Sequence, residues 1–221
     1  MRLIKMLGIA AMLAFALTAF VGANAASAAK IKTVLCKKNE KLCSAANLWT
    51  SNGEITIKAE SQKAVLLGTL AVTCKSTVTV LAETSDSDRI LGKITSLTWS
   101  NCSGCSNVET TTLPSGSLFP TSAGNGKLET TSTTTVLLKG CTIFGVECTA
   151  TASKAALEFK GGTIGGTAQS VANKVPTSLS GGFCGTSGEW DAGSEGSSPY
   201  VVTEVGGSKT GEIWISPESH A

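Results

Sequence analysis

From residue 53 onwards the chain alternates apolar and polar residues in short runs. Residues 53–60, GEITIKAE, place Ile55 and Ile57 on one side and polar side chains on the other. This period of two, built from β-branched residues and bounded by Gly, Asn and Ser, is typical of strands with one buried face. The same pattern predicts further strands at residues 76–83, 91–99, 133–140, 199–205 and 212–216.

Turn-forming sequences separate these runs. Roughly ten short strands with such spacing predict an all-β fold, either an antiparallel β-sandwich or a barrel-like domain stapled by disulfides. Residues 151–160, TASKAALEFK, are compatible with a short helix, but the alternation on either side favours a strand. The turn signals are SNGE from residue 51, SDSD from 85, AGNGK from 123, KGGTIGG from 160 and LSGG from 179.

The N-terminus has the pattern of a secretory signal peptide. Arg2 and Lys5 precede an apolar run at residues 7–22, and the small residues that follow offer cleavage after Ala25 or Ala28. A basic head, an apolar stretch and a small-residue exit are typical of such signals, and a membrane-spanning helix needs a longer run of ~20 residues. We therefore expect a signal peptide at 1–28, a secreted β domain at 29–217 and a C-terminal tail at 218–221.

Removal of the signal changes the charge of the protein. The whole chain has 18 basic and 16 acidic residues, and loss of Arg2 and Lys5 leaves 16 of each, a net charge of zero. A neutral chain without a Lys/Arg cluster has little long-range attraction for nucleic acid or anionic lipid. We expect neither a nucleic-acid partner nor a membrane partner after cleavage. One domain, or two subdomains that share a core, are both compatible with this length.

Eight cysteines follow the signal, an even number that predicts disulfides in an exported chain. Close spacing favours the pairs Cys36–Cys43, Cys102–Cys105 and Cys141–Cys148, and it leaves Cys74–Cys184 as a long-range link. The pairing is not fixed by spacing, because eight cysteines allow many connectivities. The eight are Cys36, Cys43, Cys74, Cys102, Cys105, Cys141, Cys148 and Cys184.

The segment NCSGCSN, with Cys102 and Cys105, allows three kinds of chemistry. Structural zinc needs two further Cys or His ligands in a similar motif, and the only histidine is His220 near the end of the chain. A redox dithiol needs a thiolate of low pKa, usually at a helix N-terminus. The Ser, Gly and Asn residues around the motif instead favour a structural staple, and we predict no metal or other cofactor.

Catalytic machinery is sparse. Ser-His-Asp and Cys-His mechanisms need an imidazole, and His220 lies in the tail. Paired carboxylates would allow glycoside hydrolysis without histidine, so a polysaccharide hydrolase stays as an alternative. Neither SDSD nor WDAGSEGSS matches the twelve-residue calcium loop. The candidate carboxylates are Glu54 with Glu60, Glu83 with Asp86 and Asp88, and Glu189 with Asp191 and Glu195.

Aromatic and hydroxyl side chains suggest sugar contact. Trp99 and Trp214 lie in apolar strand contexts that predict core positions, whereas Trp49, in NLWTSNG, is expected to be more exposed, and Trp190 is a further candidate. Indole rings offer stacking faces for sugar rings. Residues 130–136, TTSTTTV, would place a row of hydroxyls on one strand face, although threonine is also a routine strand residue.

Four longer segments extend over most of the mature chain: LCKKNEKLC, AVTCKSTVTV, GKITSLTWSNC and VPTSLSGGFCGTSGEWDAGS. In order and spacing they resemble a group of uncharacterised secreted, cysteine-containing all-β proteins of actinobacteria. The resemblance implies a fold family and transfers no functional residue. After the last cysteine the chain departs from the aromatic-rich strand of that group and has GEWDAGSEG followed by PYVVTEV.

These observations predict an exported, non-enzymatic β protein, secreted or at the cell surface. Its expected role is structural or interactive, with cell-wall glycan or another surface protein as the partner. Two alternatives remain open, which are a carboxylate-dependent polysaccharide hydrolase and an extracytoplasmic thiol oxidoreductase built on Cys102 and Cys105.

Overall fold

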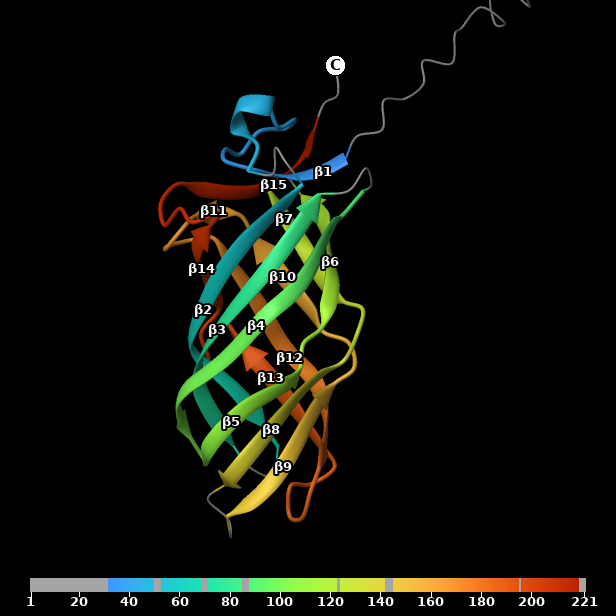
Figure 1. The fold of residues 1–221 in the computed structure, drawn as a ribbon, viewed down its shortest axis with the longest axis vertical. Helices are drawn as coiled ribbons and strands as arrows, with labels where there is room; N and C mark the ends of the chain where they lie inside the picture. The colour runs from blue at the N-terminus through green and yellow to red at the C-terminus, as the bar shows by residue number, and fades with distance from the viewer. Residues whose placement is uncertain are drawn as a thin grey trace, which may run out of the picture. The chain divides into compact units, whose positions relative to one another are not determined.

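The computed structural model describes residues 32–49, 53–68, 71–84, 88–122, 124–141, 145–194 and 196–218. Within these ranges the chain forms antiparallel strands and one short 3-10 helix, so the all-β prediction is confirmed. The main sheet closes into a barrel, which selects the barrel over the sandwich (Figure 1). In the described part of the chain, no helix is both long and apolar enough to span a membrane. The predicted signal peptide at 1–28 lies outside the described residues.

Four long strands extend through the barrel: β2 (Glu54–Leu67), β3 (Val72–Thr84), β4 (Ile90–Ser103) and β12 (Gln169–Ser180). β2, β3 and β4 pair in chain order through long antiparallel ladders. The register of β2 shifts between Ser61 and Ala64, and that of β12 shifts between Ala172 and Val175. Because the extra residues of a bulge bend a strand, these shifts divide the barrel into two halves along its length.

One half, here called the capped half, is closed by hydrogen-bonded ladders all the way round. Its strands follow the order β2, β3, β4, β6, β7, β10, β12 and β14, and β14 pairs with both β12 and β2. An eight-stranded barrel has an interior just wide enough for side chains or one small ligand. The shorter strands of this half are β6 (Ser115–Ser122), β7 (Asn125–Thr130), β10 (Ala156–Lys160) and β14 (Tyr200–Val205).

The other half, called the disulfide half, uses the opposite ends of the long strands. β12 pairs with β9, β9 with β8 and β8 with β5, while β13 lies between β12 and β2. No ladder joins β5 to β4 among the described residues, and a side-chain hydrogen bond from Trp99 Nε1 to Thr110 Oγ1 (2.8 Å) links the two strands. The short strands here are β5 (Cys105–Thr112), β8 (Thr134–Cys141), β9 (Val146–Ala152) and β13 (Ser187–Ala192).

A separate three-stranded sheet covers the end of the capped half (Figure 1). It has the order β1, β15 and β11, formed by β1 (Lys32–Cys36), β15 (Glu212–Glu218) and β11 (Gly162–Thr163), and the 3-10 helix η1 (Ala45–Asn47) follows β1. Leu35, Ile213 and Ile215 from this sheet are buried in the same core as the barrel side chains. The sheet therefore closes the barrel end with apolar side chains.

The strand predictions agree with the structure at their centres, and the observed strands β2, β3 and β4 are longer than predicted. Two details differ. Residues 130–136 do not form one strand face, because β7 ends at Thr130 and β8 begins at Thr134, with a turn between them. Residues 151–160 contain the end of β9 and the whole of β10, so the strand is correct and the helix is wrong. β15 also reaches Glu218, one residue into the expected tail.

Every described cysteine is in a disulfide, but three predicted pairings are wrong. Cys36–Cys43 is present as expected. Cys102 and Cys105 do not bond to each other, and neither do Cys141 and Cys148, nor Cys74 and Cys184. Antiparallel pairing is the reason, because it places cysteines of neighbouring strands opposite one another, as Cys105 and Cys141 in the β5–β8 register. The observed pairs are Cys74–Cys102, Cys105–Cys141 and Cys148–Cys184.

Candidate functional site

The interior of the capped half contains an apolar cavity of about 120 Å³. All eight strands of that half contribute to its lining, and the three-stranded sheet at its end adds Leu35 and Ile213. None of the described side chains that line the cavity carries a charge. An uncharged, apolar lining favours a neutral guest, because a buried charge without a partner is strongly unfavourable.

Alternation along the strands creates this lining. In β3, Val78, Val80 and Ala82 face the cavity, whereas the residues between them face outward. Ala59 on β2 and Ala155 before β10 also line it with short side chains. Where small residues line a barrel wall, the opposing side chains do not meet at the axis, and space remains between them.

A second, smaller cavity of about 40 Å³ lies in the disulfide half. Its wall includes Cys74, Trp99 and Leu138, and it shares Leu97, Thr134 and Trp190 with the larger cavity. The shared side chains therefore lie between the two spaces. The difference in volume makes the capped half the place where a molecule larger than water could fit.

Polar groups gather at one corner of the larger cavity. The Tyr200 hydroxyl and Ser76 Oγ form a hydrogen bond of 2.7 Å, and both side chains are buried. Burial raises the pKa of Tyr200, and the hydrogen bond with Ser76 opposes this only in part, so the phenol stays neutral. The Trp190 indole meets the Tyr200 ring edge to face, with ring centroids 6.1 Å apart.

Two more polar atoms at this corner are buried and have no hydrogen-bond partner among the described residues. They are Ser170 Oγ and Trp190 Nε1, and both residues line the cavity. Ser170 lies opposite Tyr200 in the β12–β14 ladder, so the two side chains are neighbours. We call Ser76, Ser170, Trp190 and Tyr200 the polar corner. Buried polar atoms are nearly always hydrogen-bonded, so unpartnered ones need an explanation.

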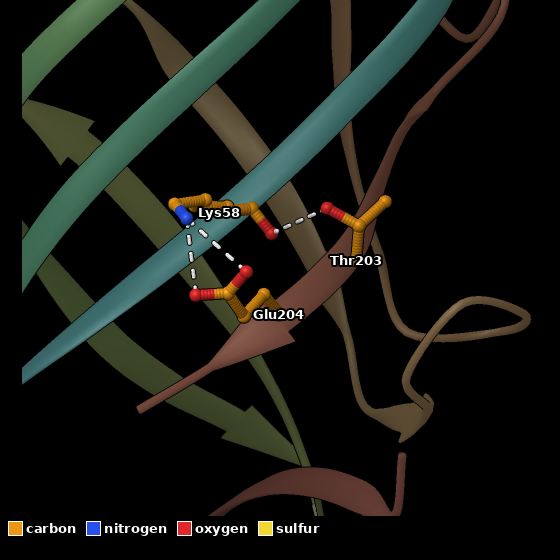
Figure 2. Close-up of polar contacts among 3 residues, drawn as sticks. All are labelled: Lys58, Thr203 and Glu204. Atoms are coloured by element: carbon orange, nitrogen blue, oxygen red, sulfur yellow. Dashed lines mark hydrogen bonds and ion pairs between the residues drawn. The ribbon is translucent and has the colours of Figure 1, made fainter. Parts of the chain in front are cut away.

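The outer face of the same wall is held by an ion pair (Figure 2). Lys58 Nζ of β2 lies 3.0 and 3.1 Å from the two carboxylate oxygens of Glu204 on β14. Thr203, the extra residue where the β14 register shifts, donates a 3.5 Å hydrogen bond to the Lys58 carbonyl. These contacts attach the bulge of β14 to β2, and the pairing of these two strands closes the capped half.

The predicted carboxylate sites have structural or surface positions. Glu189 is exposed on β13, while Asp191 is buried beneath the loop that follows. The Asp191 carboxylate accepts hydrogen bonds from the Ser194 N–H (3.1 Å), the Ser197 hydroxyl (3.0 Å) and the Ser194 hydroxyl. Burial would raise the pKa of Asp191, but these hydrogen bonds outweigh it and hold that pKa below its usual value. Asp191 therefore organises its own loop.

The other candidate carboxylates lie apart from the cavity lining. Glu54 is opposite Glu83 across β2 and β3 and both are exposed, whereas Glu60 pairs in register with Thr77 and Val201. Asp88 is exposed at the start of the β4 segment. The remaining predicted groups, Asp86, Glu195 and His220, lie outside the described residues.

The C-x2-C motif forms a tight turn between β4 and β5. Asn101 and Gly104 have positive φ angles of 49° and 91°, and a Cβ at Gly104 would lie 2.3 Å from the Ala71 carbonyl oxygen. Cys102 bonds to β3 and Cys105 to β8. The two cysteines of the motif thus staple two pairs of strands, β4 to β3 and β5 to β8. Cys36, Glu40 and Cys43 also lie close together, but the two sulfurs are bonded to each other rather than available as thiolate ligands.

The tryptophans are less exposed than a sugar-stacking platform would need. Trp49 is partly buried, donates from Nε1 to the Glu212 carbonyl (2.8 Å) and has Lys37 Nζ 5.3 Å from its ring centroid. Trp99 and Trp214 pack against the core, as predicted. Trp190 lies in the cavity wall, a position that the sequence analysis did not predict. Its signal was the alternation in GEWDA, which places Trp190 on the face opposite Glu189 and Asp191.

Comparison of the chain with protein-family models, with curated proteins and with solved structures gives no match. The functional argument therefore depends on the geometry of the barrel interior and on the disulfides.

Proposed function

We propose that this protein is an exported, non-enzymatic β-barrel that binds a small, neutral, apolar molecule inside its capped half. The observation that supports this most directly is the apolar cavity of about 120 Å³ within a closed barrel wall. Ligand sites are usually concave, mostly apolar and equipped with a few converging polar groups, and barrels are a common place for them. The polar corner supplies those groups.

The cavity volume limits the ligand to about one six-membered ring. An engineered protein cavity of ~150 Å³ lined by apolar side chains binds benzene or xenon. The present cavity is somewhat smaller, at about 120 Å³. A long acyl chain or a fused polycyclic molecule would need the wall to move.

Export is the second part of the proposal. Four disulfides are typical of proteins outside the reducing cytosol. The basic and apolar N-terminal pattern of residues 1–28 supports secretion to the cell surface or the medium. N-terminal sequencing of the protein from culture supernatant would test this. A start at Ala26 or Ala29 is expected, and retention of Met1 would contradict it.

The binding proposal is tested with toluene as the probe. We expect saturable shifts in the methyl NMR signals of Val78, Leu118 and Val202, which line the cavity. The Ala82→Leu variant should abolish them by filling the space. Ala71→Leu is the matched control, because it adds the same side chain at an exposed position. Saturable binding that is equal in wild type and Ala82→Leu, or absent altogether, would contradict the proposal.

A surface groove supports a second candidate function, contact with wall glycan. A groove of about 520 Å³ is lined by residues of β6, β7, β10 and β12, including Asn125, Glu158, Lys160 and Asn173. Amide and charged side chains of this kind can hydrogen-bond to sugars. Retention on insoluble peptidoglycan but not on a neutral resin, reduced by Asn173→Ala, is the expected result. Passage through both materials would remove this candidate.

A further inference from the structure

The polar corner restricts which neutral molecules the cavity can accept. Ser170 Oγ and Trp190 Nε1 are buried, line the cavity and lack a hydrogen-bond partner among the described residues. The indole N–H can only donate, and the hydroxyl can donate or accept. Each group can therefore donate a hydrogen bond to an acceptor atom of a guest.

The geometry around the corner supports this pairing. Tyr200 connects the two residues, since it lies opposite Ser170 in the ladder and touches Trp190 edge to face, with centroids 6.1 Å apart. The Tyr200 hydroxyl is already hydrogen-bonded to Ser76 at 2.7 Å. Ser170 Oγ and Trp190 Nε1 are the described polar atoms at this place that have no hydrogen-bond partner at all.

We infer that the ligand of the cavity is a neutral, ring-sized molecule that carries one hydrogen-bond acceptor, such as a ketone oxygen, directed at Trp190 Nε1 and Ser170 Oγ. This inference rests on the proposed function and specifies its ligand class. A carboxylate is excluded from the class because the described residues of the lining include no cationic side chain. A pure hydrocarbon can enter the cavity but leaves both donors unpaired, so it should bind more weakly than a ring of the same size that carries an acceptor.

Acetophenone and α-methylstyrene test the inference as matched probes, because they differ only in a carbonyl oxygen replaced by a methylene group. In the full-length exported protein, Trp190→Phe should weaken acetophenone binding about fivefold, the effect of one hydrogen bond, and α-methylstyrene binding less than about twofold. The carbonyl stretching frequency of bound acetophenone should also rise in Trp190→Phe as its hydrogen bond is lost. Ser170→Ala should likewise weaken acetophenone binding more than α-methylstyrene binding.

Trp99→Phe is the control variant, because Trp99 lines the smaller cavity and its Nε1 already donates to Thr110. It should leave the ratio of the two affinities unchanged. If Trp190→Phe fails to fold, the Ser170→Ala variant and the carbonyl frequency in the wild type still decide the question. Equal changes for both probes, with an unshifted carbonyl frequency, overturn this inference and leave the proposed function intact. Binding of neither probe overturns the proposed function itself.

Discussion

The two halves of the barrel stabilise the same long strands by different means. In the capped half the ladders continue round the barrel, the larger core cluster lies inside, and the described residues include no disulfide in the barrel wall. Among the described residues of the disulfide half, no ladder joins β4 to β5, the core cluster is smaller and consists largely of cysteines, and three disulfides link segments of the wall. The three disulfides thus lie in the half with the interrupted ladder and the smaller core cluster, where they reinforce strands that already pair, such as β3 with β4 and β5 with β8.

Cavity volume is larger in the half that has fewer covalent links. The larger space of about 120 Å³ is in the half whose described barrel wall contains no disulfide, and the disulfide half has only about 40 Å³. A cavity lowers stability because its lining loses packing contacts. The capped half tolerates one because its wall is fully hydrogen-bonded and its end is closed by the β1–β15–β11 sheet.

The largest effect is expected from removing a disulfide of the disulfide half. Cys105→Ala combined with Cys141→Ala opens a link between residues 36 positions apart and should lower the free energy of unfolding by about 4 kcal/mol. Urea denaturation measures this value, and hydrogen exchange should show β5 and β8 opening before β6 and β7. Cys36→Ala with Cys43→Ala, a link over 7 positions, should lower it by about 2.5 kcal/mol. The comparison fails if the short link proves the more stabilising.

The next effect concerns the polar corner. Tyr200→Phe leaves the buried Ser76 hydroxyl without its partner and should destabilise the protein by about 2 kcal/mol. Adding Ser76→Ala should recover most of that loss, since removing both partners leaves no unsatisfied group. Thermal unfolding of the two single variants and the double variant measures the coupling. Strictly additive losses would show that the hydrogen bond contributes little.

The same change, Ala to Leu, made once in each half should distinguish how tightly the two halves are packed. Ala150→Leu, next to the smaller cavity, should overpack the disulfide half and cost about 1.5 kcal/mol. Ala82→Leu, next to the larger cavity, should change the free energy of unfolding by less than about 1 kcal/mol because the added side chain enters existing space. Chemical denaturation of both variants gives the values. Equal losses would mean that the larger cavity cannot accept a side chain.

Asp191 should make stability depend on acid pH. Its pKa is lowered in the folded protein, so its contribution is fully present above the ordinary aspartate pKa of 3.8 and is lost as pH falls through the lowered value. Asp191→Asn should therefore cost about 1 kcal/mol at pH 7 and much less near pH 2. Urea midpoints at the two pH values test this. If the stability difference between wild type and Asp191→Asn is as large at pH 2 as at pH 7, the charge of Asp191 does not cause it.

The smallest effect is expected at the ion pair of Figure 2. Lys58→Ala should lower stability by about 0.5 kcal/mol, because the Lys58 side chain is 43% exposed and surface ion pairs contribute little. The loss should diminish in high salt. Lys127→Ala, which removes another exposed pair, with Glu129, is the matched control. A loss above about 2 kcal/mol would show that this contact is essential for closing β14 onto β2.

Alternation of apolar and polar residues was sufficient to predict the all-β class, the centres of the main strands and the inward positions of Ile55 and Ile57, which both pack in the larger core cluster. A period of two is a local property, because neighbouring side chains on a strand must point to opposite faces. The cysteine content likewise predicted a disulfide-linked protein, and the short Cys36–Cys43 loop was identified correctly.

Only the tertiary structure decided which strands are neighbours, and with them the other three disulfides and the cavity. Cys102 and Cys105 are close in the sequence, yet the turn between them directs one to β3 and the other to β8. Ser170 and Trp190 lie on the consecutive paired strands β12 and β13, and Tyr200 joins them only when β14 pairs with β12 and β2 to close the barrel. Strand order depends on contacts between residues far apart in the chain, and a local pattern carries no information about them.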